Sequence, residues 1–210
     1  MKMAIFLALV HHPVLDRSGR VVTSALTNVD VHDLARSGRT FGVTRSYVVT
    51  PVALQQRMVT EMVEHWQLGA GSAHLRRAEA MQRVSVMPSI DAARTDITKR
   101  TGRAPVVAVT AARWEPEGRK AGTQEPESFD LWRHKIASAG DDAQPLLLVF
   151  GTGWGLAPEV LAEADVRLPP VQRRPELLDA EAGDGPYNHL SVRAAAAIIL
   201  DRLLGDRDVH

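Results

Sequence analysis

Two polar turns in the C-terminal half of the chain carry residue types that could hold a small ligand. The first, at residues 151–155, follows an apolar run over 146–150, and the second, at 187–191, opens an Ala-rich apolar segment. Open α/β sheets build ligand sites where a strand ends in glycines and where a polar turn enters a core helix. Glycine leaves the main chain bare, so a flat ligand can approach it closely. We therefore expect one pocket at these turns, lined largely by main chain.

Two nucleotide-binding motifs come close to the 151–156 turn without matching it. A dinucleotide fingerprint needs a glycine where Leu156 stands, and a P-loop needs Lys and then Ser or Thr after the glycines. A nicotinamide-dependent dehydrogenase would therefore depend on the glycines alone, and Leu156 argues against it. A tight turn, in which the glycines only supply positive φ, is the structural alternative to a ligand-binding loop.

The architecture that would position these turns is a mostly parallel sheet flanked by helices. Apolar runs of strand length alternate with helical patterns, which is typical of this α/β class. Strands are expected at residues 4–10, 46–50, 84–87, 106–110, 146–150 and 166–168, and a turn or small hairpin at 13–22. One domain is expected over 1–210, with mobile loops at about 113–127 and 172–185.

The helix starts follow from capping residues. Asp30 is the expected N-cap of a first helix that ends before Gly42, and Thr50-Pro51 is expected to open a second helix with Leu54 on its packed face. Ser89 is the expected cap of a helix that ends near Gly102. Further helices are expected after residue 126, over 158–164, and from the polar turn at 187–191 onward.

Composition excludes several classes of protein. Lys and Arg number 25, as do Asp and Glu, so no basic field covers the whole surface, although a local patch could still bind nucleic acid. Cysteine is absent, which excludes disulfides and thiolate metal sites and suits a reducing cytoplasm. The histidines show no ligand spacing, so no metal is expected. The apolar start reads as a buried strand, and no run reaches the ~20 residues that cross a bilayer, so we expect a soluble protein away from membranes.

Residues 27–43 combine Asn, Asp, His and Arg on the first predicted helix. Asp33 and Arg36 fall one turn apart on it, which would make at least an exposed ion pair. Together with the two C-terminal turns, this segment resembles the SPOUT superfamily of S-adenosylmethionine-dependent RNA methyltransferases. Residues 36–43 resemble its first motif, 150–156 its glycine-rich second motif, and 189–199 its last motif, a polar turn that enters an Ala-rich helix.

The resemblance covers most of the chain and carries implications for fold and partners. It implies S-adenosylmethionine as cofactor and RNA, either tRNA or rRNA, as substrate. It also implies a trefoil knot near the C-terminus, and a homodimer in which first-motif residues of the partner complete each active site. The apolar final helix, which must be buried in a core or an interface, fits the homodimer.

The resemblance further implies the site residues. Catalytic residues would be Arg36, Asp30, Asn28 and Asn188. Cofactor contacts would come from Thr110, Ala111, Gly151, Thr152, Gly153, Trp154, Gly155, Leu168, Pro169, His189, Leu190 and Ser191. RNA contacts would come from Arg36, Arg39, Arg45, Arg113, Arg119 and Lys120.

Three polar positions differ from the family pattern. Asp30 and His189 stand where the family has Asn, and the glutamate of the second motif is missing. Two reactions are therefore left open: methylation of a ribose 2′-hydroxyl assisted by Arg36, and methylation of a base nitrogen with Asp30 or Asp33 as the base. A non-catalytic module that binds a nucleoside or RNA, or serves assembly, is the alternative to an enzyme.

Overall fold

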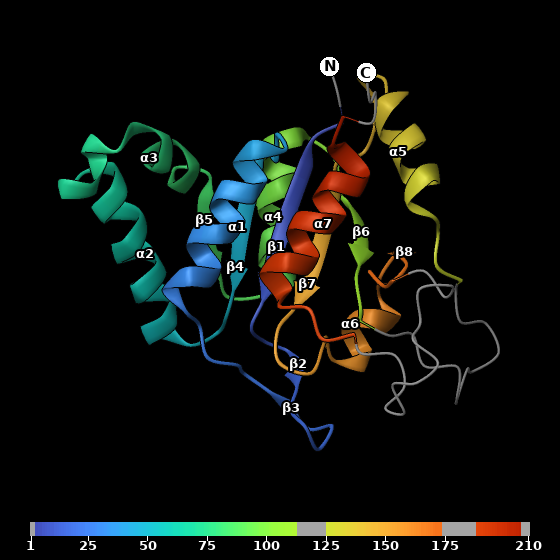
Figure 1. Ribbon diagram of the computed structural model, residues 1–210, viewed down its shortest axis with the longest axis horizontal. Helices are drawn as coiled ribbons and strands as arrows, with labels where there is room; N and C mark the ends of the chain where they lie inside the picture. The colour runs from blue at the N-terminus through green and yellow to red at the C-terminus, as the bar shows by residue number, and fades with distance from the viewer. Residues whose placement is uncertain (1–2, 113–124, 174–187, 207–210) are drawn as a thin grey trace.

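A six-stranded parallel sheet forms the centre of the molecule (Figure 1). The computed structural model describes residues 3–112, 125–173 and 188–206. The strands of the sheet lie in the order β5-β4-β1-β7-β6-β8. Their bounds are β1 (Ile5–Val10), β4 (Arg45–Val49), β5 (Val84–Met87), β6 (Val106–Val109), β7 (Leu146–Gly151) and β8 (Val166–Arg167). The predicted α/β class and strand positions are confirmed.

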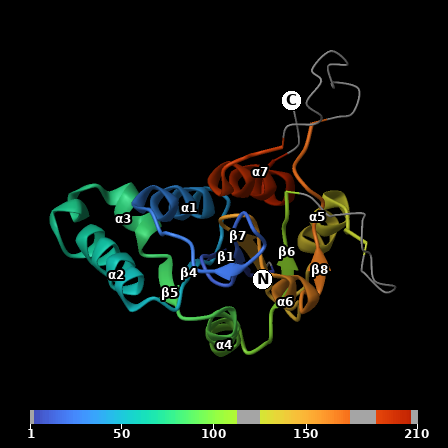
Figure 2. The same cartoon turned by 90° about the horizontal axis from the view of Figure 1, so that it is seen from below.

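Helices cover both faces of the sheet (Figure 2). On one face lie α1 (Asn28–Thr40), α7 (Val192–Leu204) and α5 (Phe129–Ala137), and on the other lie α4 (Ile90–Thr101) and α6 (Pro158–Ala162). Beyond the edge strand β5 the chain adds α2 (Ala53–Gln67), the 3₁₀ turn η1 (Ala70–Ala73) and α3 (Leu75–Met81). The sequence did not predict η1 or α3.

The central strands are apolar on both sides because both of their faces are covered. All six residues of β1 are buried. Alternate residues of the sheet enter two cores: one beneath α1, α5 and α7, and one beneath α4 and α6. A third core lies between α1, α2 and α3 and the β4–β5 edge. This packing holds the carboxyl ends of the strands in fixed positions.

The first helix begins earlier than predicted. Thr27, with an extended backbone, is its N-cap, and its hydroxyl accepts a hydrogen bond from the Asp30 amide at 3.2 Å. The same hydroxyl donates to Asp30 Oδ2 at 2.5 Å, so the two residues bond reciprocally. The prediction of Asp30 as the cap is therefore wrong, and Asp30 belongs to the first turn of α1.

The second helix begins later than predicted, at Ala53. The Thr50 hydroxyl accepts from the Val52 amide at 3.3 Å and donates to Gln55 Oε1 at 2.5 Å. Thr50 therefore shapes the turn before the helix and does not cap it. Leu54 is 73% exposed, which contradicts its predicted place on the packed face. Ser89 and Gly102 bound α4 as predicted.

The predicted turn after β1 is a small antiparallel hairpin of β2 (Val14–Leu15) and β3 (Val21–Val22). The Asp16 carboxylate accepts from the amides of Ser18 and Arg20, at 2.8 and 3.0 Å. Gly19, with a φ of 80°, completes the turn. The hairpin projects from the carboxyl edge of the sheet (Figure 1).

Some expectations concern residues that the structure does not describe. The loops expected at 113–127 and 172–185 fall mostly in 113–124 and 174–187, outside the described residues. The expected knot involves the connection that contains 174–187, so it stays a prediction. Among the helices that are described, none combines the length and the apolarity that crossing a membrane requires.

Candidate active site

The carboxyl edge of the sheet brings the predicted cofactor-contact residues together. β1, β7, β6 and β8 are neighbours and run parallel, so the turns that follow them lie side by side. Thr110 and Ala111 follow β6, residues 152–155 follow β7, and Leu168 and Pro169 follow β8. The turn at 188–191 joins them, because Asn188 Nδ2 donates to the Ala112 carbonyl at 2.8 Å.

The glycine turn pairs with the β2–β3 hairpin through the main chain. The Trp154 amide donates to the Leu15 carbonyl at 3.0 Å, and the Leu15 amide donates to Gly155 O at 2.9 Å. The Ala157 amide donates to Pro13 O at 3.2 Å. These donors are therefore engaged within the protein, and the expectation that the loop presents a bare main chain does not hold for them.

Contacts within the turn explain two of its glycines. A Cβ on Gly151 would lie 2.7 Å from the Leu156 amide nitrogen, and one on Gly153 would lie 2.9 Å from the Leu15 carbonyl oxygen. Gly153 also has a φ of 59°, a backbone conformation that residues other than glycine rarely adopt. The glycines thus serve the tight turn. The side chain of Trp154, 62% exposed, is the group that this turn presents to solvent.

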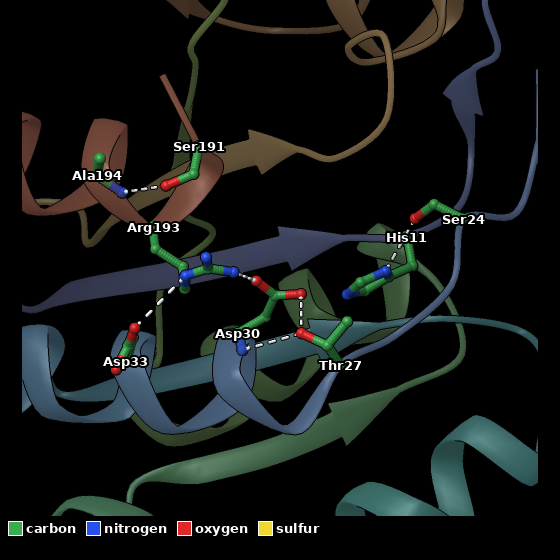
Figure 3. Close-up of polar contacts among 8 residues, drawn as sticks. All are labelled: His11, Ser24, Thr27, Asp30, Asp33, Ser191, Arg193 and Ala194. Atoms are coloured by element: carbon green, nitrogen blue, oxygen red, sulfur yellow. Dashed lines mark hydrogen bonds and ion pairs between the residues drawn. The ribbon is translucent and has the colours of Figure 1, made fainter. Parts of the chain in front are cut away.

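A hydrogen-bonded chain of polar side chains fixes the end of β1 to its neighbours. The fully buried His11 bonds through Nδ1 to Ser24 Oγ at 2.9 Å (Figure 3). Ser24 Oγ bonds to Thr152 Oγ1, which also donates to the Val10 carbonyl at 2.9 Å. Burial lowers the pKa of His11 and outweighs the opposing effect of the nearby Asp30 carboxylate. The imidazole is therefore neutral at neutral pH and acts as a rigid link.

An arginine of α7 bridges two acids of α1 (Figure 3). Arg193 Nη1 pairs with Asp30 Oδ1, and Arg193 Nε lies 3.4 Å from Asp33 Oδ2. Asp30 is buried and its carboxylate is also held by Thr27. The Asp33 side chain is 42% exposed. Of the two acids, Asp33 is the one that a substrate can reach.

Arg36 lies one turn beyond Asp33, 4.0 Å from its carboxylate, with its side chain 61% exposed. Both residues line a depression of about 520 Å³ between α1 and α7, together with Ser191 and Arg193. Ser191 caps α7 by accepting from the Ala194 amide at 3.2 Å. The depression thus joins the polar face of the first helix to the end of the 188–191 turn. Asn28, the first residue of α1, is exposed and does not line the depression.

The predicted RNA contacts do not all share this region. Arg39 pairs with Glu79 of α3, its Nε donating at 2.7 Å. Arg45 begins β4 and therefore lies at the opposite, amino edge of the sheet, where it donates to Ser85 Oγ at 2.7 Å. Arg113, Arg119 and Lys120 lie outside the described residues.

The sequence reasoning missed Arg193, although one signal marks it. It stands in the first turn of an apolar helix, where the helix dipole disfavours a cation. A lone cation there needs an acidic partner, and two aspartates of α1 provide it. His11 and Ser24 carry no comparable signal, because a long-range contact alone brings them to Thr152.

Solved structures of methylases share this fold. A methylase family protein from Neisseria gonorrhoeae superposes with a TM-score of 0.59 at 16% sequence identity, over 99% of this chain and 84% of the other. The family model for S-adenosylmethionine-dependent RNA methyltransferases matches residues 4–205. The chain therefore belongs to this family, which confirms the resemblance and the methyl donor predicted from the sequence.

Two relatives contain the matched region in chains of different length. A Nitratidesulfovibrio vulgaris protein named tRNA (guanine-N(1)-)-methyltransferase is 43% identical over 96% of this chain, which spans only 42% of that relative. An uncharacterised protein of Aquifex aeolicus is 34% identical over 95% of this chain and 87% of its own length. The matched unit thus occurs both as part of a longer protein and as most of a chain.

Proposed function

We propose that the protein transfers a methyl group from S-adenosylmethionine to a base nitrogen of tRNA or rRNA, at the depression between α1 and α7. The observation that carries this proposal is the partly exposed Asp33 carboxylate, held by Arg193 beside the turn that leads into α7. A base nitrogen that carries a proton, as in guanine or uracil, must lose it when it is methylated, and a positioned carboxylate can accept that proton.

The turns at the carboxyl edge would hold the methyl donor. The exposed indole of Trp154 and the half-exposed Leu190 offer flat and apolar surfaces, and the 188–191 turn is tied to the end of β6. The amides of Thr152, Trp154 and Gly155 bond to the Val10, Leu15 and Thr152 carbonyls, so this turn would contact the donor mainly through the Trp154 side chain. When bound, S-adenosylmethionine supplies an electrophilic methyl group on a sulfonium.

Asp30, Asp33 and Arg36 of α1 and Arg193 of α7 form one ionic cluster, the α1–α7 cluster, in which each residue then has a separate task. Asp33 would accept the proton that the acceptor nitrogen releases on methylation. Arg193 holds Asp33 toward the acceptor, and Asp30 anchors Arg193 from the buried side. Arg36 neutralises the phosphate next to the acceptor nucleotide. Positioning of this kind can supply about 7–11 kcal/mol of the rate enhancement.

Methylation of a ribose 2′-hydroxyl is the second candidate. The exposure of Arg36 in the same depression favours it, because a guanidinium can orient a hydroxyl and its phosphate. The name of the Nitratidesulfovibrio relative favours a base nitrogen, guanine N1 of tRNA. That protein is more than twice the length that this chain spans.

Two further parts of the proposal concern assembly and location. Ala194 and Ala197 of α7 border the depression and leave a shallow surface beside α1. We expect a second copy of the chain to pack near this surface, so that the protein is a homodimer. We expect it in the cytoplasm, where its RNA substrates are made.

Incubation with radiolabelled S-adenosylmethionine and total bacterial RNA, followed by nucleoside mass spectrometry, tests the reaction. We expect a labelled base, and a labelled ribose would establish the second candidate instead. Asp33→Asn keeps the shape but removes the proton acceptor, so transfer should fall by about 10²–10⁴-fold. Asp130→Asn, at an exposed acid of α5, serves as the control.

Calorimetry with S-adenosylmethionine separates the enzyme from a non-catalytic module. The engaged amides of the glycine turn are the observation that favours a module. We expect binding to wild type and to Asp33→Asn alike. An absence of heat at millimolar ligand, or full transfer by Asp33→Asn, would refute the proposed role of this site.

A further inference from the structure

A second groove, outside the cofactor edge, runs between the C-terminal half of α1 and the η1–α3 segment. Its volume is about 960 Å³. Arg36 and Arg39 line one wall, and His74, Arg76 and Arg77 line the other. The η1–α3 segment lies beside α1 at the end of the sheet where β5 forms the edge (Figures 1 and 2).

The charge of this groove differs from that of the chain as a whole. The whole chain has equal numbers of basic and acidic residues, whereas the groove has four arginines and a single acid, Glu79. Glu79 is already paired with Arg39. The guanidinium of Arg39 lowers the pKa of this carboxyl, so the pair is ionised at neutral pH. The groove therefore keeps a net positive charge and attracts anions.

One arginine of the groove is held in place by an aromatic ring. The Arg77 guanidinium carbon lies 4.8 Å from the centre of the Trp66 ring. Trp66 in turn packs tightly against Gly71 of η1, where an added Cβ would lie 2.7 Å from the ring. Stacking on tryptophan restricts a guanidinium without consuming its hydrogen-bond donors. Arg77 is thus preorganised to bind an anion.

The dimensions and the position of the groove favour a nucleic acid strand over a small anion. Arginines stand on both walls, so consecutive phosphates can be bound from either side. Arg36 also lines the depression between α1 and α7 that contains Asp33. A strand that lies in the groove would therefore lead directly into the proposed acceptor site.

We propose that this groove binds the phosphodiester backbone of the RNA substrate next to the nucleotide that is methylated. The inference rests on the proposed function and extends it, because it adds His74, Arg76 and Arg77 to the substrate-binding surface. Phosphate contacts fix the register of a nucleic acid and carry no sequence information themselves. Bulk tRNA is therefore a suitable probe even before the natural substrate is known.

The test measures binding of labelled bulk tRNA to the full chain over a series of salt concentrations. Arg76→Gln should weaken binding about three- to tenfold and reduce the slope of log affinity against log salt by about one. Arg76→Gln/Arg77→Gln should lower the slope further. Arg57→Gln removes an equal charge at an exposed position of α2 outside the groove, and we expect no change in slope.

Companion measurements separate this inference from the proposed function. Heat of S-adenosylmethionine binding should be the same in all variants, since none of them touches the cofactor edge. If wild type methylates RNA and the groove variants keep the wild-type affinity and salt slope, the proposed RNA-binding role of the groove is wrong, whereas the proposed enzymatic function is retained. If the variants instead change only the mass seen by light scattering, the groove is a contact between subunits, and the inference is overturned. If wild type neither binds tRNA nor methylates RNA, both proposals fall.

Discussion

At the scale of single residues, the α1–α7 cluster depends on a charge placed against the helix dipole. Arg193 lies in the first turn of α7, where the free amides of the helix end already carry partial positive charge. Asp30 and Asp33 compensate for this placement by pairing with it from α1. The same pairing fixes the carboxylate that we propose as the base. Stability and positioning therefore depend on the same ionic contacts.

The buried His11 predicts a loss of stability in mild acid. Its pKa is lowered from 6.5 by burial, so below about pH 6.5 the unfolded chain binds more protons than the folded one. The free energy of unfolding should therefore fall as the pH drops from about 7.5 to about 5.5. Urea unfolding at each pH measures it. In His11→Gln the stability should be lower overall, but its dependence on pH over this range should be flatter.

His134→Gln, at an exposed position of α5, provides the matched control and should keep the wild-type dependence. Burial and the Arg77 guanidinium also lower the pKa of His32, which therefore contributes a dependence of the same sign. Some slope should accordingly persist in His11→Gln. An unchanged slope in that variant would mean that His11 does not titrate differently in the folded and unfolded chains.

At the scale of elements, the glycine turn and the β2–β3 hairpin form one unit. Two main-chain hydrogen bonds join them, a third links Ala157 just after the turn to Pro13, and Val14 forms an antiparallel bridge with Leu156. The hairpin thereby restrains the turn that follows β7. A motif that resembles a cofactor loop in sequence is, in this structure, also a packing contact between segments far apart in the chain.

Gly151→Ala tests this unit. The added Cβ would lie 2.7 Å from the Leu156 amide and 2.8 Å from its side chain, so the turn must shift. We expect the free energy of unfolding to drop by about 1–3 kcal/mol, as is usual for overpacking. Gly140→Ala is the control, because its Cβ would meet nothing within 4 Å, and it should be neutral or slightly stabilising. Equal effects of the two substitutions in urea unfolding would show that the turn accommodates a side chain.

The elements show what sequence patterns determine and what they do not. Strand positions were predictable because buried parallel strands need continuous apolar runs, as in β1 and β7. Helix starts were less predictable, because Thr27 and Asp30 are both good capping residues and only the backbone geometry decides which of them caps the helix. The pairing of Leu15 with the glycine turn was not predictable, since it joins main chains whose amino acids need no particular type.

At the scale of the whole molecule, the proposed homodimer predicts the molar mass in solution and how a substitution changes it. Wild type should run as a dimer in size-exclusion chromatography with light scattering. Ala197→Arg adds a long cation to the shallow surface between α1 and α7, and it should shift the protein to monomer. Ala53→Arg, at an exposed position of α2, should remain dimeric. A monomeric wild type would remove the homodimer from the proposal.

The composition of the chain gave no indication of the basic groove between α1 and α3. The net charge of zero gave no reason to look for a basic groove, and the residues that form it are divided between α1 and α3. Arg36 and Arg39 were predicted to contact RNA, while Arg76 and Arg77 were not, because the η1–α3 segment has no strong helical pattern in the sequence. Only the fold brings the two pairs of arginines to one groove.

The strand order has a consequence for synthesis on the ribosome. β1 emerges first, yet one of its two neighbours in the sheet is β7, which emerges late. Until then a wholly apolar strand keeps an unpaired side, which exposes the nascent chain to aggregation and to chaperones. Most of the turns assigned to the methyl donor are translated later still. The donor can therefore stabilise the fold only after the 188–191 turn has been translated, which would make cellular methyl-donor supply a factor in how many folded molecules persist.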